Sequence, residues 1–212
     1  MKTTKKTHHQ HHWLLGFPSS FLLCIGIGLF LSALGVAQDS APDTSLLPNG
    51  SFELEASAGG GKLKPEGWGF FPMTKSYTGI YVGDMSQAHS GERAASIIGD
   101  GTTEPVTSAM WLSDLVEVKP GTAYSIVGWI KTSECTGKGA WLWINAYEQK
   151  DGKAEGHVTF AKPPVFFSGT EDWQEWSAQI YIPNNVHFLK VACRLDGPGT
   201  AWFDDIQVTK GE

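Results

Sequence analysis

The feature that most constrains the fold is a succession of short apolar and aromatic runs, each bounded by glycine, proline or asparagine. Short runs with alternating apolar and polar positions, separated by turn residues, are typical of strands in an antiparallel sandwich or barrel. No stretch of the domain has a long helical period. The runs occupy residues 67–71, 79–85, 94–100, 109–119, 123–132, 140–149, 156–161, 174–183, 187–196 and 201–208. The sequence therefore predicts an all-β fold of two packed antiparallel sheets.

Length and charge limit the number of domains and the kinds of partner that this chain can have. The chain has 212 residues, enough for one domain with a sizeable core. Its 16 lysines and arginines face 22 acidic residues, a formal charge of −6. Three lysines fall within residues 1–37, which contain no acid, so the remainder carries 13 basic residues against 22 acidic ones, a charge of −9. Because nucleic-acid binding depends on a basic surface, a nucleic-acid partner is not expected.

The N-terminus has the pattern of an export signal. Lysines and a histidine cluster precede an apolar run over residues 21–37, which ends in small residues. We expect residues 1–37 to be a signal peptide cleaved after Ala37, residues 38–45 to be a polar leader, and the protein to be secreted, periplasmic or on the cell surface. Two alternatives place it at a membrane instead: an uncleaved anchor, or lipid attachment at Cys24.

Two cysteines, Cys135 and Cys193, remain outside the signal. In an oxidising compartment a disulfide between them would close a long loop and stabilise the fold by about 3 to 5 kcal/mol. The alternative is two separate buried thiols. Their distance along the chain does not decide between the two.

Alternation within three runs separates a core face from an outward face, because neighbouring side chains in a strand point to opposite sides. In residues 140–147 the core set is Ala140, Leu142, Ile144 and Ala146. The opposite set is Trp141, Trp143, Asn145 and Tyr147. The same split turns Trp129 and Lys131 outward in residues 123–132, and Lys190 and Arg194 outward in residues 187–196. Large aromatic and long polar side chains on one face suit contact with a ligand.

Several segments, taken in order, resemble a known family. They are LLPNGSFELE (46–55), a Gly-Trp pair soon after, HSGERAASI (89–97), VEVKPGTAYSIVGWIKT (116–132) and GPGTAWFDDIQV (197–208). In this order they resemble the CenC-type carbohydrate-binding modules of the family 4, 9 and 22 group. The resemblance implies a galactose-binding-domain-like jelly-roll β-sandwich, here over residues 46–210. It further implies a domain associated with glycoside hydrolases that binds glycans without cleaving them.

The resemblance also implies a structural calcium ion where the N-terminal segment, the SGERA segment and the last strand meet. Calcium takes about six to eight oxygen ligands from carboxylates and backbone carbonyls. The candidate ligands are Ser51, Glu53, Ser90, Arg93, Asp204 and Asp205. In the alternative, Glu53 only pairs with Arg93 and the aspartates are solvated at a sheet edge.

The outward aromatic residues predict the glycan site. Aromatic rings stack on the apolar faces of sugars while amides and cations bind hydroxyl groups. The candidate site residues are Trp129, Lys131, Trp141, Trp143, Asn145, Tyr147, Lys190 and Arg194. In the alternative, the tryptophans lie under loops and form a secondary core.

Catalysis is not expected. Glycosidases need two carboxyl groups that flank one bond, whereas consecutive Asp204 and Asp205 in a strand should point to opposite faces. His89, His157 and His187 lack metal-ligand spacing, and no nucleophile motif occurs. The sequence thus favours a non-catalytic module that binds a polysaccharide or oligosaccharide. A surface sandwich that binds proteins is the alternative, and a glycoside hydrolase is the least favoured.

Overall fold

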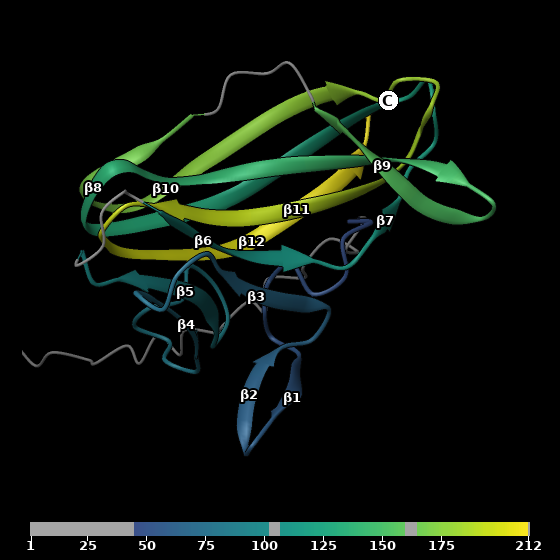
Figure 1. Cartoon of the computed structure of the whole chain (residues 1–212). Helices are drawn as coiled ribbons and strands as arrows, with labels where there is room; N and C mark the ends of the chain where they lie inside the picture. Colours follow the sequence, from purple (N-terminus) through teal and green to yellow (C-terminus); the bar gives the residue numbers. More distant parts are fainter. Residues whose placement is uncertain (1–44, 102–106, 160–164, 212) are drawn as a thin grey trace, which may run out of the picture. The chain divides into compact units, whose positions relative to one another are not determined.

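The computed structural model describes residues 45–101, 107–159 and 165–211 (Figure 1). Every regular element in these ranges is a β-strand, and all pairings are antiparallel. The strands are β1 (Glu55–Gly59), β2 (Lys62–Pro65), β3 (Trp68–Pro72), β4 (Tyr77–Val82), β5 (Ala94–Gly99), β6 (Ser108–Ser113), β7 (Val116–Glu117), β8 (Ala123–Lys150), β9 (Lys153–Thr159), β10 (Phe167–Tyr181), β11 (Val186–Asp196) and β12 (Gly199–Lys210). The predicted all-β, two-layer fold is confirmed.

The long strand β8 belongs to both layers of the sandwich. Its first half pairs with β10 and β12, and its second half pairs with β9 and β11. One layer, here called the β12 sheet, has the order β4-β5-β12-β8-β10. The other, the β11 sheet, has the order β3-β6-β11-β8-β9, with β7 also on β11. Figure 1 shows β8 turning back on itself at one end of the domain.

The turn within β8 depends on residues in the left-handed backbone region. Glu134, Gly137 and Gly139 have φ angles of 54°, 75° and 83°. A Cβ on Gly139 would lie 2.1 Å from the carbonyl oxygen of Phe167, so only glycine fits there. This corner carries the chain from the β12 sheet to the β11 sheet.

The core lies between the two sheets, and alternation places its residues. Ile126 and Ile130 are buried in the first half of β8, and Leu142 and Ile144 in the second half. Leu189, Val191, Cys193 and Leu195 are buried at alternate positions of β11. The predicted core faces are therefore confirmed for all three runs, while Asn145 and Ala192 on the outward faces are buried as well.

The two cysteines are free thiols in the structure, so the predicted disulfide is not formed and the alternative of separate buried thiols applies. Cys135 lies at the β8 corner, where its Sγ donates to the Thr200 carbonyl oxygen at 3.2 Å. Cys193 is in the middle of β11, opposite Trp111 and Leu142 on the neighbouring strands. Both thiols are buried, and burial raises the pKa of each.

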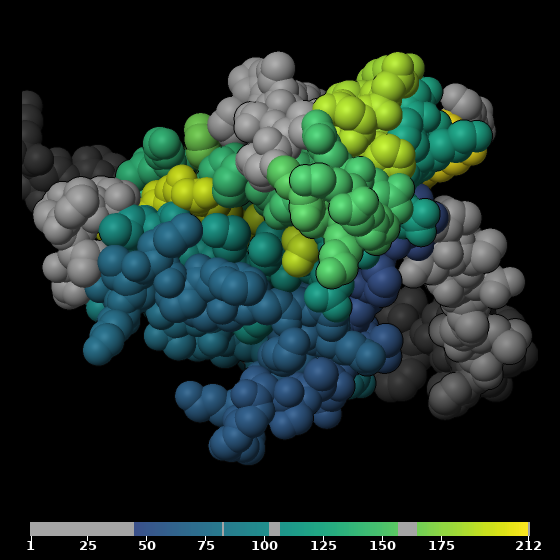
Figure 2. All heavy atoms as spheres, turned by 45° about the vertical axis from the view of Figure 1, so that its right-hand side comes forward, coloured from purple at the N-terminus to yellow at the C-terminus, as the bar shows by residue number. Residues whose placement is uncertain are grey.

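The segment before β1 packs along the last strand. The Leu46 amide donates to the Val208 carbonyl at 2.7 Å, and the Ile206 amide donates to the Gly50 carbonyl at 2.8 Å. A Cβ on Gly50 would lie 1.7 Å from the Ile206 carbonyl oxygen, which excludes larger residues. In Figure 2 the purple and blue atoms of this segment and of β1 to β3 lie together along the lower side of the domain.

The predicted signal peptide and most of the polar leader, residues 1–44, lie outside the described residues. Within the described part of the chain, no helix is long and apolar enough to cross a membrane.

Candidate functional site

The outward face of the β11 sheet collects aromatic side chains in rows that run across the strands. Residues directly opposite each other in antiparallel strands share a face, and their side chains interact. One row consists of Trp141, Arg194, Met110 and Phe71. The next consists of Trp143, Ala192, Leu112 and Gly69. The outward face is thus aromatic and apolar, with one arginine among the rings.

Trp141 and Trp143 form a fixed pair. Their ring centroids are 5.9 Å apart with planes 27° apart, and Phe166 meets Trp141 edge-on at 5.3 Å. The Arg194 guanidinium carbon is 5.3 Å from the Trp141 centroid and 5.1 Å from that of Trp143. Cation–π and ring–ring contacts of this kind hold side chains in one orientation. The aromatic pair is therefore preorganised.

Arg194 is held in place by two further partners. Its Nε donates to Asp196 Oδ1 at 2.7 Å and its Nη2 donates to Ser108 Oγ at 2.9 Å. Asp196 and Ser108 are both buried. Beside them is a hollow of about 370 Å³, lined by Thr107, Ser108, Gly137, Lys138, Arg194 and Asp196. The aromatic pair thus borders a polar recess.

The face continues along β8 and β11 beyond the aromatic pair. Lys190 lies opposite Asn145, and Phe188 lies opposite Tyr147. Asn145 is buried and Tyr147 half-buried, and burial raises the pKa of Tyr147. The structure therefore brings together six of the predicted ligand residues: Trp141, Trp143, Asn145, Tyr147, Lys190 and Arg194.

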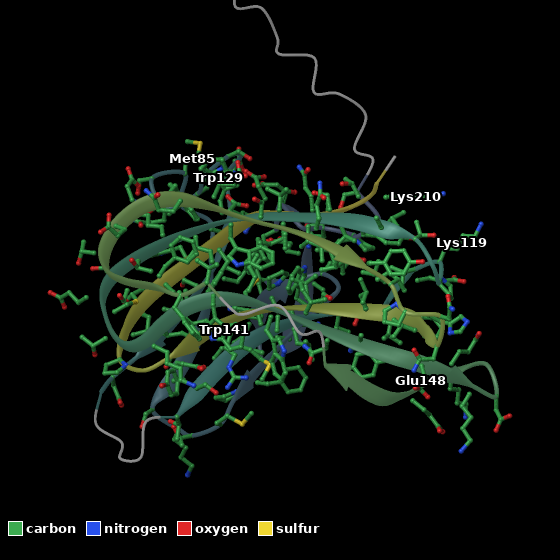
Figure 3. The ribbon with its side chains drawn as sticks, turned by 90° about the horizontal axis from the view of Figure 1, so that it is seen from above. Met85, Lys119, Trp129, Trp141, Glu148 and Lys210 are labelled. Carbon is green, nitrogen blue, oxygen red and sulfur yellow. The ribbon has the colours of Figure 1, made fainter. Side chains whose placement is uncertain are left out.

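Trp129 and Lys131 do not belong to this face, which corrects the predicted site. They lie in the first half of β8, before its corner, so they point outward from the β12 sheet. Trp129 is opposite Asp204, and the Lys131 Nζ is 3.5 Å from Asp172 Oδ1. In Figure 3, Trp129 lies beside Met85 on the other side of the sandwich from Trp141.

Trp129 is covered by a histidine. The His89 ring stacks on it with centroids 3.9 Å apart and planes 15° apart, and Trp173 meets His89 edge-on at 5.5 Å. The predicted alternative, in which a tryptophan lies under a loop, therefore applies to Trp129.

Asp204 and Asp205 both hold the segment that contains His89, which corrects the expectation that their carboxylates point to opposite faces. Asp204 Oδ2 accepts from the amides of His89 at 2.8 Å and Ser90 at 3.3 Å. Asp205 Oδ2 is 2.7 Å from His89 Nδ1, and its Oδ1 accepts from Ser90 Oγ at 2.9 Å. Asp205 has a φ of 48°, and the β12–β8 register shifts after Asp204. This bulge interrupts the alternation.

Asp204 is fully buried. Burial, followed by the neighbouring charge of Asp205, raises its pKa to about 7, although three backbone amides favour the ionised form. One of these donors is the Asp205 amide, at 2.7 Å from Asp204 Oδ1. A buried carboxyl with this pKa changes charge near neutral pH.

Glu53 joins the N-terminal segment to the same region. Its Oε1 accepts from the amides of Glu92 at 2.9 Å and Arg93 at 3.0 Å, while the Arg93 guanidinium pairs with Glu55 at 3.0 Å. Glu53 thus contacts Arg93 as the alternative expected, but through the Arg93 backbone amide, and it also binds the Glu92 amide. Ser51 is half-buried in the same N-terminal segment.

The oxygen atoms that could bind a calcium ion are of a suitable kind, but some of them already accept hydrogen bonds from backbone amides. The carboxylate and carbonyl oxygens near Glu53, Ser90 and Asp204 are the hard ligands that calcium prefers. No group of three or more His, Cys, Asp or Glu side chains within the described ranges is arranged to hold a metal. A cation at this place would therefore depend on backbone carbonyls as well as carboxylates.

Sequence reasoning missed five residues of these two faces: Ser108, Phe166, Trp173, His89 and Asp196. Asp196 follows Arg194 by two positions, so alternation could have placed the two on one face. The Ser108–Arg194 contact joins residues 86 positions apart and needs the β6–β11 register.

Comparison with known proteins gives distant relatives. No family model matches the chain. The tRNA nuclease WapA of Bacillus subtilis (strain 168) is 27% identical over an alignment of 186 residues that covers 83% of this chain and 7% of that protein. The tRNA(Glu)-specific nuclease WapA of Bacillus subtilis subsp. natto matches with the same identity and coverage. The chain thus spans about 7% of the length of the curated relatives it matches.

Solved structures share the fold. The enzymatically active domain of bacteriophage CBA120 tailspike protein 4 has a TM-score of 0.55 and 11% identity, over 79% of this chain and 22% of that one. The CBM22-1 xylan-binding domain of Paenibacillus barcinonensis Xyn10C has a TM-score of 0.50 and 15% identity, over 80% and 97% of the two chains. A CBM4 structure matches at 0.50 and 15%, over 78% and 99%. The domain therefore has the jelly-roll β-sandwich fold found in carbohydrate-binding modules.

Proposed function

We propose that this protein is a non-catalytic carbohydrate-binding module that holds a polysaccharide or oligosaccharide on the outward face of its β11 sheet. The observation that carries the proposal is the pair Trp141 and Trp143, fixed against each other and against Arg194. The indole rings offer an apolar surface to the C–H face of a sugar ring. The polar groups of Lys190 and Arg194 lie along the same face, with Asn145 buried opposite Lys190, and can orient hydroxyl groups.

Fold likeness supports the proposal without naming the glycan. Solved structures with this fold include a xylan-binding domain. Membership of the CenC-type group, and an association with glycoside hydrolases, stay part of the proposal.

The curated relatives are named as tRNA nucleases, but that activity is not proposed for this chain. The shared segment is 7% of those proteins, and the chain here is acidic outside its first 37 residues. An acidic domain is repelled by phosphate backbones. We propose that the shared segment is a binding module within those longer proteins.

Calcium and export complete the proposal. We propose that Ca²⁺ bound near Glu53 and the Asp204–Asp205 pair would neutralise the acidic cluster and fasten the N-terminal segment to β12. Chelator should then lower the melting temperature and added calcium should restore it, whereas no shift together with no calcium in elemental analysis would refute the site.

For export, mass spectrometry of the mature N-terminus tests cleavage after Ala37, and an intact Met1 in the membrane fraction would contradict it.

Affinity electrophoresis through gels that contain soluble glycans tests the binding face. We expect at least one glycan to retard the protein and Trp143→Ala to abolish the retardation. Trp129→Ala is the matched control, because it removes the same side chain from the same strand on the opposite sheet. The site assignment fails if, in a gel whose glycan retards the unaltered protein, the Trp143→Ala variant is retarded to the same extent. If no glycan retards the native, folded protein, the alternative of a protein-binding sandwich is favoured.

A further inference from the structure

The recess beside the aromatic pair has a composition of its own. Its charged lining groups are Arg194, Lys138 and Asp196, and the remaining lining residues are Thr107, Ser108 and Gly137. Its volume of about 370 Å³ is within the usual range of small-molecule sites. Since Arg194 also contacts Trp141 and Trp143, a sugar chain stacked on the rings would reach the recess with its next residue or a substituent.

Arg194 retains hydrogen-bond donors in this recess. Its Nε is used by Asp196 and one Nη2 hydrogen by Ser108. Among the described residues, no partner takes the Nη1 hydrogens. A guanidinium that is fixed at Nε and still has Nη donors presents the fork that binds a carboxylate through two parallel hydrogen bonds.

The charge of the lining favours an anion. Asp196 offsets one positive charge by pairing with Arg194, and its side chain is only 10% exposed. Lys138 is exposed and adds a second positive charge. Within the described lining residues the balance is therefore one net positive charge. A neutral sugar would gain little from this excess, whereas a carboxylate would gain from both cations.

Resting on the proposed function, we infer that this recess is a subsite for the carboxylate of a uronic acid within the bound glycan. Arg194 binds the carboxylate through its free Nη donors, Ser108 and Asp196 keep the guanidinium in position, and Lys138 adds long-range attraction. The module then prefers acidic polysaccharides over neutral ones of the same backbone.

Two matched pairs of polymers test the inference with the full protein. Polygalacturonate is compared with its methyl ester, and glucuronoxylan with its carboxyl-reduced form, by affinity electrophoresis and calorimetry. We expect the acidic member of at least one pair to bind about tenfold more tightly, the effect of one charge-assisted hydrogen bond. The preference should shrink as salt is raised.

Variants locate the preference. Lys138→Glu reverses the charge of the cation that adds long-range attraction and should reduce the preference for the acidic polymer, whereas Lys62→Glu, in the separate β1–β2 sheet, should not change it. Arg194→Lys keeps the charge but loses the fork, and should weaken acidic polymers more than neutral ones. If each neutral polymer binds as tightly as its acidic partner, the subsite is refuted while the proposed function stands. If none of the four polymers nor any neutral glycan binds, both are refuted.

Discussion

The two outward faces of the sandwich use the same kind of residue in different ways. Both take tryptophan from β8, yet Trp141 and Trp143 pair with each other and with an arginine, while Trp129 is covered by His89. His89 in turn is held by Asp204 and Asp205. An outward position therefore does not make a binding residue. We infer that the β11-sheet face serves binding and the β12-sheet face serves to fasten a loop.

The largest effect should come from Asp204, on the fastened face. Asp204→Ala removes the acceptor of three backbone amides in a fully buried place. Each buried donor left without a partner costs about 1 to 3 kcal/mol, so we expect the free energy of unfolding to fall by about 3 kcal/mol. Denaturant unfolding measures it. Asp172→Ala, an exposed acid on the same face, is the control and should leave the free energy of unfolding nearly unchanged. A loss below about 1 kcal/mol for Asp204→Ala would contradict the fastening role.

The next effect separates the tryptophans. Trp129→Ala should lower the free energy of unfolding by about 2 kcal/mol, because it removes the ring on which His89 stacks. Its glycan affinity, measured at a temperature where the variant is folded, should equal that of the unaltered protein. Trp143→Ala should show the opposite pattern, with binding lost and the smaller loss of stability. Equal losses of binding in both variants would show that the two faces are not functionally distinct.

The pH dependence of stability should also come from the fastened face. The pKa of Asp204 is about 7 in the folded state against an ordinary value of 3.8, so the folded state binds the extra proton between these values. Its contribution to stability is then complete below about pH 4 and is lost as the pH rises towards 7. In chelator, we expect the free energy of unfolding to fall over that range, because Asp204 loses its proton in the folded state as the pH approaches 7.

Asp204→Asn is the control for that dependence, since it has no proton to exchange. If another group is responsible, the free energy of unfolding should change with pH equally in the two proteins between pH 4 and 7.5. A steeper fall for the unaltered protein supports Asp204.

Alternation predicted the inward and outward residues of each strand but not how the strands are assembled. The period of two placed Leu142 inward and Trp141 outward, because it is a local property of extended backbone. The crossing of β8 between the sheets depends on the residues with left-handed backbone at its corner. One of them, Glu134, is not a glycine, so the sequence does not indicate its conformation. The bulge at Asp205 could not be predicted from the sequence either. Its φ of 48° occurs at a non-glycine residue inside a strand, where no turn residue marks it. Contacts such as Arg194 with Ser108 depend on the register of distant strands.

The smallest effect distinguishes two lysines that the sequence placed in one site. Lys131 pairs with exposed Asp172 at 3.5 Å on the β12 sheet, and water screens a surface pair of this kind, so that it contributes little to stability. Lys190 lies opposite Asn145 on the β11 sheet. Lys131→Ala should therefore leave glycan affinity unchanged, while Lys190→Ala should weaken it about threefold to tenfold through a lost hydrogen bond to the sugar. Isothermal calorimetry on the two variants, with the same glycan, measures the difference. If Lys131→Ala weakens binding as much as Lys190→Ala, the ligand extends around the edge of the sandwich and the division between the faces is wrong.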